Sequence, residues 1–151
     1  MRFLILFAVA LPLWALVPPD SSRPRPGVAA DVAVAPFTID RDSAGVLRAV
    51  ADTCLERLVR GLKAKGIAVA RYPELSEKSL RSVLPVPWAV LGHLGREEGQ
   101  FRAELRLLEV ESGDEMRSYF NSNKDPETIG DLGVAAANRI ALFVEGRKGA
   151  R

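Results

Sequence analysis

The sequence predicts a single α/β domain with some α+β character: one mixed sheet of about five strands, in the order β-α-β-α-β-β-β-α, with helices packed on it. Three observations predict this fold. Short apolar runs alternate with amphipathic stretches between residues 31 and 85, which favours parallel strands covered by helices. Residues 100–121 then contain two consecutive strands with one wet face. An apolar content of 48% with 26% charged residues is typical of a globular chain.

The body opens with a short apolar run, residues 31–37, which predicts a buried first strand. An amphipathic helix follows, because apolar residues recur at intervals of three and four with charged residues between them. Asp42 or Ser43 is expected to cap this helix, and Gly66 to end it. Its apolar stripe comprises Leu47, Val50, Cys54, Leu58 and Leu62.

Residues 67–71 predict a second short strand, and residues 73–85 a short helix, since this stretch begins with proline and has its acids early. Residues 87–100 predict a third strand that runs into a glycine-flanked turn. We expect Gly92, Gly95 and Gly99 to serve that turn rather than to hold a phosphate, because no helix N-terminus follows them.

The fourth strand shows the most regular alternation in the chain. Phe101, Ala103, Leu105 and Leu107 are apolar, and charged residues stand between them. A period of two predicts one dry and one wet face. Residues 111–114 are expected to form a turn into a fifth strand, residues 115–121.

The last predicted element is a helix that Asp125 caps and Gly146 ends. Its expected buried stripe comprises Leu132, Ala136, Ile140 and Phe143. Residues 147–151 are expected to form a disordered basic tail. The folded domain therefore spans residues 31–146.

The N-terminus predicts export. Residues 3–17 carry no charge and follow Arg2, which is typical of a signal peptide or an uncleaved N-terminal anchor formed by residues 1–17. Residues 18–30 are rich in proline and predict an extended linker. We therefore expect a periplasmic or otherwise exported protein, either free or tethered to the inner membrane through residues 3–17. No cysteine stands directly after the apolar run to accept a lipid.

Charge argues against nucleic-acid binding. Three of the 21 basic residues and one of the 19 acidic residues lie within residues 1–30, which leaves 18 of each in the body. A nucleic-acid binder needs a concentrated basic face. The single cysteine, Cys54, excludes an internal disulfide and is expected to be a buried hydrophobe.

The sequence predicts no catalytic, cofactor or metal site. It has no nucleophile elbow, and His93 is its only histidine. We expect His93 to be a structural or hydrogen-bonded residue, because the local sequence offers it no catalytic partners. Asp40 and Asp42 come nearest to metal-ligand spacing, but capping the following helix explains them better.

The order of motifs resembles that of the amino-terminal domain of TolB and of the related CsgG and FlgO envelope proteins. The motifs that carry the resemblance are Val34-Ala35-Pro36-Phe37, then Leu91-Gly92, then Leu107 or Leu108 leading to Gly113. The resemblance covers residues 31–145 and implies an envelope module that binds protein partners without catalytic residues. Charged residues on the predicted hairpin argue against the membrane pore of CsgG.

We therefore predict a non-enzymatic, extracytoplasmic protein-binding module, an accessory in envelope assembly or transport. Arg102, Glu104 and Arg106 are its candidate partner contacts, and an open sheet edge could accept a strand. One alternative is a small-ligand or glycan-binding domain whose pocket is lined by Trp88, Tyr119 and Phe120. A second alternative is a hydrolase that uses His93 beside an acid.

Overall fold

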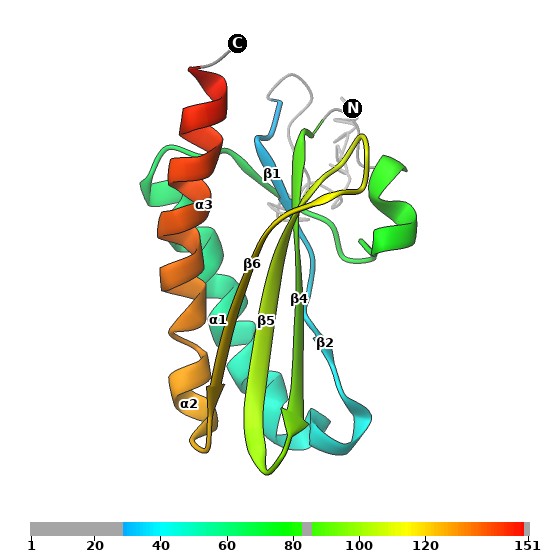
Figure 1. Ribbon diagram of the computed structural model, residues 1–151, viewed down its shortest axis with the longest axis vertical. Helices are drawn as coiled ribbons and strands as arrows, with labels where there is room; N and C mark the ends of the chain where they lie inside the picture. Colours follow the sequence, from blue (N-terminus) through cyan, green and yellow to red (C-terminus); the bar gives the residue numbers. More distant parts are fainter. Residues whose placement is uncertain (1–28, 83–85, 150–151) are drawn as a thin grey trace, which may run out of the picture.

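A computed structural model describes residues 29–82 and 86–149 as an open mixed sheet with helices on one face (Figure 1). The sheet has six strands, five of them in the order β3-β1-β4-β5-β6, with β2 pairing β4. The predicted fold class is confirmed. The strands are β1 (Val32–Val34), β2 (Thr38–Ile39), β3 (Val69–Arg71), β4 (Trp88–Glu97), β5 (Gln100–Glu109) and β6 (Glu115–Asn123). The α-helices are α1 (Ala44–Ala64), α2 (Pro126–Ile129) and α3 (Leu132–Lys148), and two 3-10 segments are η1 (Arg41–Ser43) and η2 (Glu77–Ser82).

The two halves of the sheet differ in strand direction, as predicted. β1 pairs in parallel with β3 on one side and with β4 on the other. β4, β5 and β6 form an antiparallel meander. The sequence did not predict β2, a two-residue strand that pairs in parallel with His93 and Leu94 of β4.

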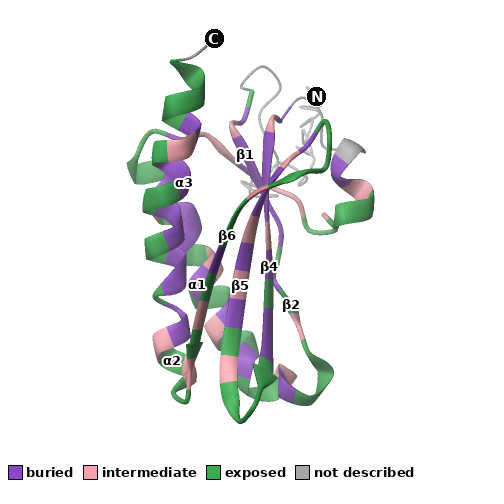
Figure 2. Ribbon diagram, viewed as in Figure 1, coloured by how far each residue is buried: buried purple, intermediate pink, exposed green. Residues whose placement is uncertain are grey.

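One face of the sheet is packed under α1 and α3, and the main core lies between these layers (Figure 2). The alternation in β5 supplies this core as predicted, because Ala103, Leu105 and Leu107 are buried. The two helices approach each other closely: a Cβ at Gly133 would come within 2.2 Å of the Cys54 carbonyl oxygen. The largest fully buried side chains are Leu47, Leu58, Leu62, Leu94, Leu105, Leu107, Leu108, Ile129, Ile140, Val32, Val34 and Val90.

The opposite face of the sheet carries a smaller core near β1 and β3. Ala33 and Ala89 point to this side and pack with Leu80 of η2 and with Val86. Farther along β4, β5 and β6, this face is polar. We call this part of the sheet, opposite α1 and α3, the open face.

Several helix boundaries differ from the predictions. The predicted helix in residues 73–85 is only the 3-10 segment η2 within the part that the structure describes. The predicted side-chain cap of α1 is wrong, because η1 leads into the helix and Ser43 makes no capping hydrogen bond. Gly66, with φ of 76°, follows the end of α1 as expected.

The predicted last helix is divided into α2 and α3. Asp125 caps α2 as predicted, since its side chain accepts a hydrogen bond from the Glu127 amide. The predicted end at Gly146 is wrong. Arg147 and Lys148, which were expected in a disordered tail, form the last turn of α3, and Lys148 pairs with Asp31 at 2.6 Å.

The prediction that Gly92 and Gly95 belong to a turn is wrong. Both lie inside β4, and only Gly99 serves the β4–β5 turn, with φ of 79°. A Cβ at Gly92 would lie 2.3 Å from the Phe37 ring, and one at Gly95 would lie 2.1 Å from the Asp40 carboxylate. The two glycines therefore make room for side chains from the segment around β2.

The predicted signal peptide or anchor, and all but the last two residues of the predicted linker, lie outside the described residues. Within residues 29–82 and 86–149, no helix combines the length and apolar character that a membrane span requires.

Candidate functional site

The open face brings together the three charged residues that the sequence singled out. Arg102, Glu104 and Arg106 all point to it, because they alternate with the buried residues of β5. The strand register sets Thr38, His93, Glu104 and Phe120 in one row across the sheet. The role of the three charged residues as partner contacts stays a prediction.

Each of these charged side chains has a partner within the face. Arg102 forms an ion pair with Glu97, and this hydrogen bond raises the pKa of the guanidinium. Arg106 lies 2.5 Å from Glu77 of η2. Glu104 accepts a hydrogen bond of 3.2 Å from the Ser118 hydroxyl. These pairs are exposed, so they orient the side chains more than they stabilise the fold.

Phe120 is a largely exposed apolar side chain on this otherwise polar part of the described sheet. Its side chain is 71% exposed, and the Arg102 guanidinium lies 5.9 Å from the centre of its ring. From the sequence alone, Phe120 is expected only in a glycan pocket. Its place beside Arg102 follows from the pairing of β5 with β6, which no local pattern reveals.

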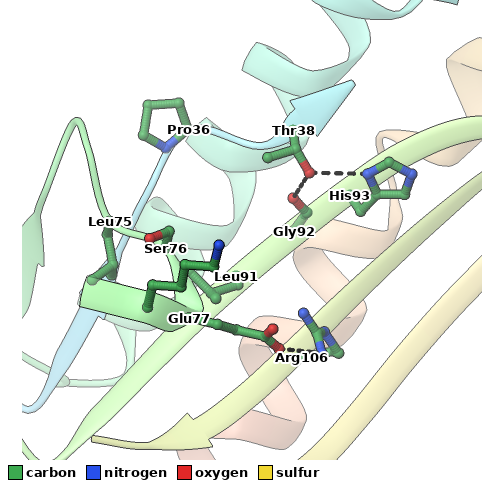
Figure 3. A pocket seen from close by; sticks show the side chains of 10 residues that line it. Pro36, Thr38, Leu75, Ser76, Glu77, Leu91, Gly92, His93 and Arg106 are labelled. Carbon is green, nitrogen blue, oxygen red and sulfur yellow. Dashed lines mark hydrogen bonds and ion pairs between the residues drawn. The ribbon is translucent and has the colours of Figure 1, made fainter. Parts of the chain in front are cut away.

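A hollow of about 280 Å³ lies between η2 and the open face (Figure 3). Pro36, Leu75 and Leu91 give it apolar walls. Thr38, His93 and Arg106 add polar groups, and Arg106 is held there by Glu77. Its size is close to the lower limit for small-molecule sites.

His93 lies beside this hollow and is hydrogen-bonded, as the sequence predicted. Its Nδ1 is 2.9 Å from the Thr38 hydroxyl, and its Nε2 is 3.2 Å from the Asp40 carboxylate. The Thr38 hydroxyl also donates to the Gly92 carbonyl at 3.2 Å. The side chains of His93 and Asp40 are 51% and 48% exposed. The contacts connect β2 and the residue after it to β4.

The pair of His93 and Asp40 meets one condition of the hydrolase alternative, a histidine beside an acid. The imidazole of His93 lies between the Thr38 hydroxyl and the Asp40 carboxylate and contacts both. General-base catalysis uses such an arrangement of hydroxyl, imidazole and carboxylate. Among the described residues, no group of three or more His, Cys, Asp and Glu side chains could hold a metal ion.

The aromatic pocket of the glycan alternative is contradicted. Trp88 and Tyr119 are buried on the helix side of the sheet, and the Trp88 ring packs edge-on against Phe143 with centroids 5.2 Å apart. Phe120 points to the open face. The three rings therefore cannot line one cavity.

Cys54 is buried in the main core, as predicted. Burial raises the pKa of its thiol to about 11, which keeps the sulfur protonated at neutral pH. A protonated, buried thiol is a weak nucleophile.

No protein-family model matches the chain, and no curated protein matches it. Several solved structures are similar to the chain over most of its length. The PelC dodecamer from Paraburkholderia phytofirmans is 16% identical, with a TM-score of 0.48 over 74% of this chain and 88% of PelC. Protein XCC0632 from Xanthomonas campestris is 12% identical, with a TM-score of 0.47 over 85% of this chain and 94% of that protein.

TolB from Acinetobacter baumannii is also similar, at 16% identity and a TM-score of 0.42. The match covers 82% of this chain but only 29% of TolB. The motifs predicted a likeness to TolB, which is among these structures. The predicted likeness to CsgG and FlgO stays a prediction. At these identities the comparisons concern the arrangement of helices and strands and say nothing of activity.

Proposed function

We propose that residues 31–146 form a non-enzymatic protein-binding module that works outside the cytoplasm, in the cell envelope. The observation that carries the proposal is Phe120, a largely exposed aromatic ring with an arginine over it, on a face that the helices leave open. Aromatic and arginine side chains are enriched in protein interfaces, where a few residues carry most of the binding energy. Arg102, Glu104 and Arg106 would surround this ring as a polar rim.

The contacts of His93 with Thr38 and Asp40 support a structural role for His93 rather than a catalytic one. Both ring nitrogens are engaged, one by Thr38 and the other by Asp40, and the side chain is half exposed to water. Electrostatic catalysis gains most where water is excluded. Connecting the two-residue strand β2 to β4 accounts for these contacts.

The proposal of export rests on residues 1–17, whose apolar run follows a basic start. Fusing residues 1–30 to alkaline phosphatase tests it, because that enzyme needs disulfides that form outside the cytoplasm. We expect activity from this fusion. The control fusion carries Leu4→Arg, Leu6→Arg and Val9→Arg and should be inactive. Equal activity from both would contradict export.

A binding experiment tests the proposed face. The full chain with a C-terminal affinity tag would be cross-linked in envelope preparations, and its partners identified by mass spectrometry. We expect a partner that wild type captures and Phe120→Ser loses. The matched control is Val46→Ser, which removes an exposed apolar side chain from α1, outside the proposed face.

The identified partner, once purified, should bind wild type directly. Loss of about tenfold or more in affinity with Phe120→Ser is expected of an interface aromatic. Equal capture by wild type and Phe120→Ser would exclude this face, and the absence of any partner would contradict the function itself.

A second candidate function has one observation in its favour, the hollow beside η2. Its apolar walls and the Arg106 guanidinium would suit a small carboxylate with an apolar body. Ligand-observed NMR with a set of short fatty acids tests it. Signals that shift for wild type but not for Leu91→Arg, which would fill the hollow, would support this candidate.

A further inference from the structure

The edge of the sheet at β6 has the properties of a strand acceptor. β6 is nine residues long and, within residues 29–82 and 86–149, pairs only with β5, so alternate amide and carbonyl groups point away from the sheet. Proteins protect such edges with charged side chains, especially lysine, and with proline, β-bulges or short length. Residues 115–123 contain no lysine or proline. The register shift between β5 and β6 lies at the start of β6, between Glu115 and Arg117, so residues 117–123 form a regular edge. At the other edge, β3 has only three residues.

Three arginines gather beside this edge on its helix side. The Arg117 guanidinium lies 5.2 Å from the centre of the Phe143 ring, and that of Arg147 lies 5.4 Å from it. Arg139 lies on α3, which packs beside β6 (Figure 1). The charges of Arg117 and Arg139 lower the pKa of the Tyr119 phenol, although burial outweighs them and raises it overall. We call Arg117, Arg139 and Arg147 the arginine cluster.

The arginine cluster has no acidic partner among the described residues. None of its members takes part in an ion pair there, whereas Arg57, Arg71, Arg102 and Arg106 all do. All three side chains are exposed. The body is neutral in sum, so this local excess of positive charge is not a general property of the surface.

We infer that β6 accepts an extended acidic segment of a partner protein as an added strand. The backbone of the segment would bond to the free edge of β6, and its alternate carboxylates would face the arginine cluster. Leu142, three residues from Arg139 on α3 and 70% exposed, would meet an apolar side chain of the segment. This inference rests on the proposed function and specifies the chemistry of the partner.

A second copy of the chain fits the same edge less well. Antiparallel pairing of β6 with β6 of another copy would bring two arginine clusters to one seam. Like charges across an interface oppose association. An acidic segment instead neutralises the cluster, so charge complementarity selects it over self-pairing.

The probe is a fluorescein-labelled nonapeptide of alternating valine and glutamate, measured by fluorescence anisotropy with the full chain. We expect binding that weakens with added salt, because exposed ion pairs are screened. Two matched peptides serve as controls. Alternating valine and lysine tests charge, and the valine–glutamate peptide with N-methylated alternate amides tests backbone pairing. Both should bind at least about tenfold more weakly.

Variants of the chain then locate the site. Arg139→Glu should weaken binding by about threefold to tenfold, and Arg117→Glu with Arg139→Glu by more, as expected for exposed charges at an interface. The matched control is Arg48→Glu on α1, an exposed arginine with no ion pair among the described residues. Because Arg117 stacks on Phe143, circular dichroism melting checks that each variant is folded.

Three outcomes would overturn the inference: no binding of the valine–glutamate peptide, equal binding of the N-methylated peptide, or dimers that the glutamate variants strengthen. The result is separable from the proposed function. If the peptide fails while the captured partner still depends on Phe120, the strand-acceptor inference falls and the binding module stands. If the peptide binds but no envelope partner is found, β6 is a strand acceptor and the proposed function in the envelope is wrong.

Discussion

The Phe37 ring packs directly over Gly92, so that a Cβ at residue 92 would lie 2.3 Å from the ring carbon Cδ1. The two residues belong to separate motifs of the sequence, Val34-Ala35-Pro36-Phe37 and Leu91-Gly92. Phe37 is buried in the main core, and Gly92 lies within β4 beneath it. The two motifs therefore make one packing unit that seats the segment between β1 and β2 on the sheet.

Gly92→Ala should lower the free energy of unfolding by about 1–3 kcal/mol, the usual cost of overpacking a core. Urea denaturation at pH 7 measures it. Gly45→Ala is the control, because nothing lies within 4 Å of its Cβ and alanine favours a helix. In the double variant with Phe37→Leu the two losses should not add, since the smaller side chain relieves the clash. Equal stability of Gly92→Ala and wild type would contradict this packing.

The contact between α1 and α3 gives a second prediction. A Cβ at Gly133 would meet the Cys54 carbonyl oxygen at 2.2 Å, and a backbone atom of a packed helix cannot move aside easily. Gly133→Ala should therefore cost about 2 kcal/mol or more, despite its gain in helix propensity. Gly146→Ala on the same helix, with open space around its Cβ, should be neutral or stabilising. Thermal melting of the two variants distinguishes close packing from propensity.

His93 should matter for stability and not for turnover. His93→Ala removes hydrogen bonds to Thr38 and Asp40, which should cost about 1 kcal/mol because both bonds are exposed. Partner capture should persist. A screen of ester, phosphate and glycoside substrates should give the same background for wild type and the variant. Hydrolysis by wild type that His93→Ala abolishes would instead establish the hydrolase alternative.

The sequence predicted what periodicity controls and missed what depends on contacts between distant residues. The repeat from Leu47 to Leu62 and the alternation from Phe101 to Leu107 were sufficient to predict α1, β5 and the buried faces of both. β2 was missed because two residues cannot show a period. The glycines of β4 were assigned to a turn because their need for space comes from Phe37 and Asp40, far away in the chain.

The candidate binding surfaces divide in the same way. The wet face of β5 was predictable, because Arg102, Glu104 and Arg106 alternate with apolar residues. The arginine cluster was not, since it forms only when β6 packs beside α3 and brings Arg117 to Phe143. No pattern within either segment indicates that its arginines lack acidic partners.

Cys54 should make stability depend on pH in the alkaline range. Its thiol has an ordinary pKa of 9.0 when the chain is unfolded and about 11 in the folded core, because burial disfavours the thiolate. Between these values the unfolded chain binds fewer protons than the folded one, so the free energy of unfolding falls as pH rises. The contribution is fully present below about pH 9 and lost by about pH 11, and a difference of about two pKa units corresponds to about 2–3 kcal/mol.

Urea denaturation of wild type and Cys54→Ala at pH 7.5, 9 and 10.5 would isolate this contribution. Lysine and tyrosine titration affects both proteins, so the difference between their pH profiles belongs to the thiol. Wild type should lose more stability than Cys54→Ala across this interval. A thiol reagent at pH 8 should react with Cys54 only after urea unfolds the chain. Parallel pH profiles, together with rapid labelling of the folded protein, would mean that the sulfur is accessible and that α1 and α3 do not pack as described.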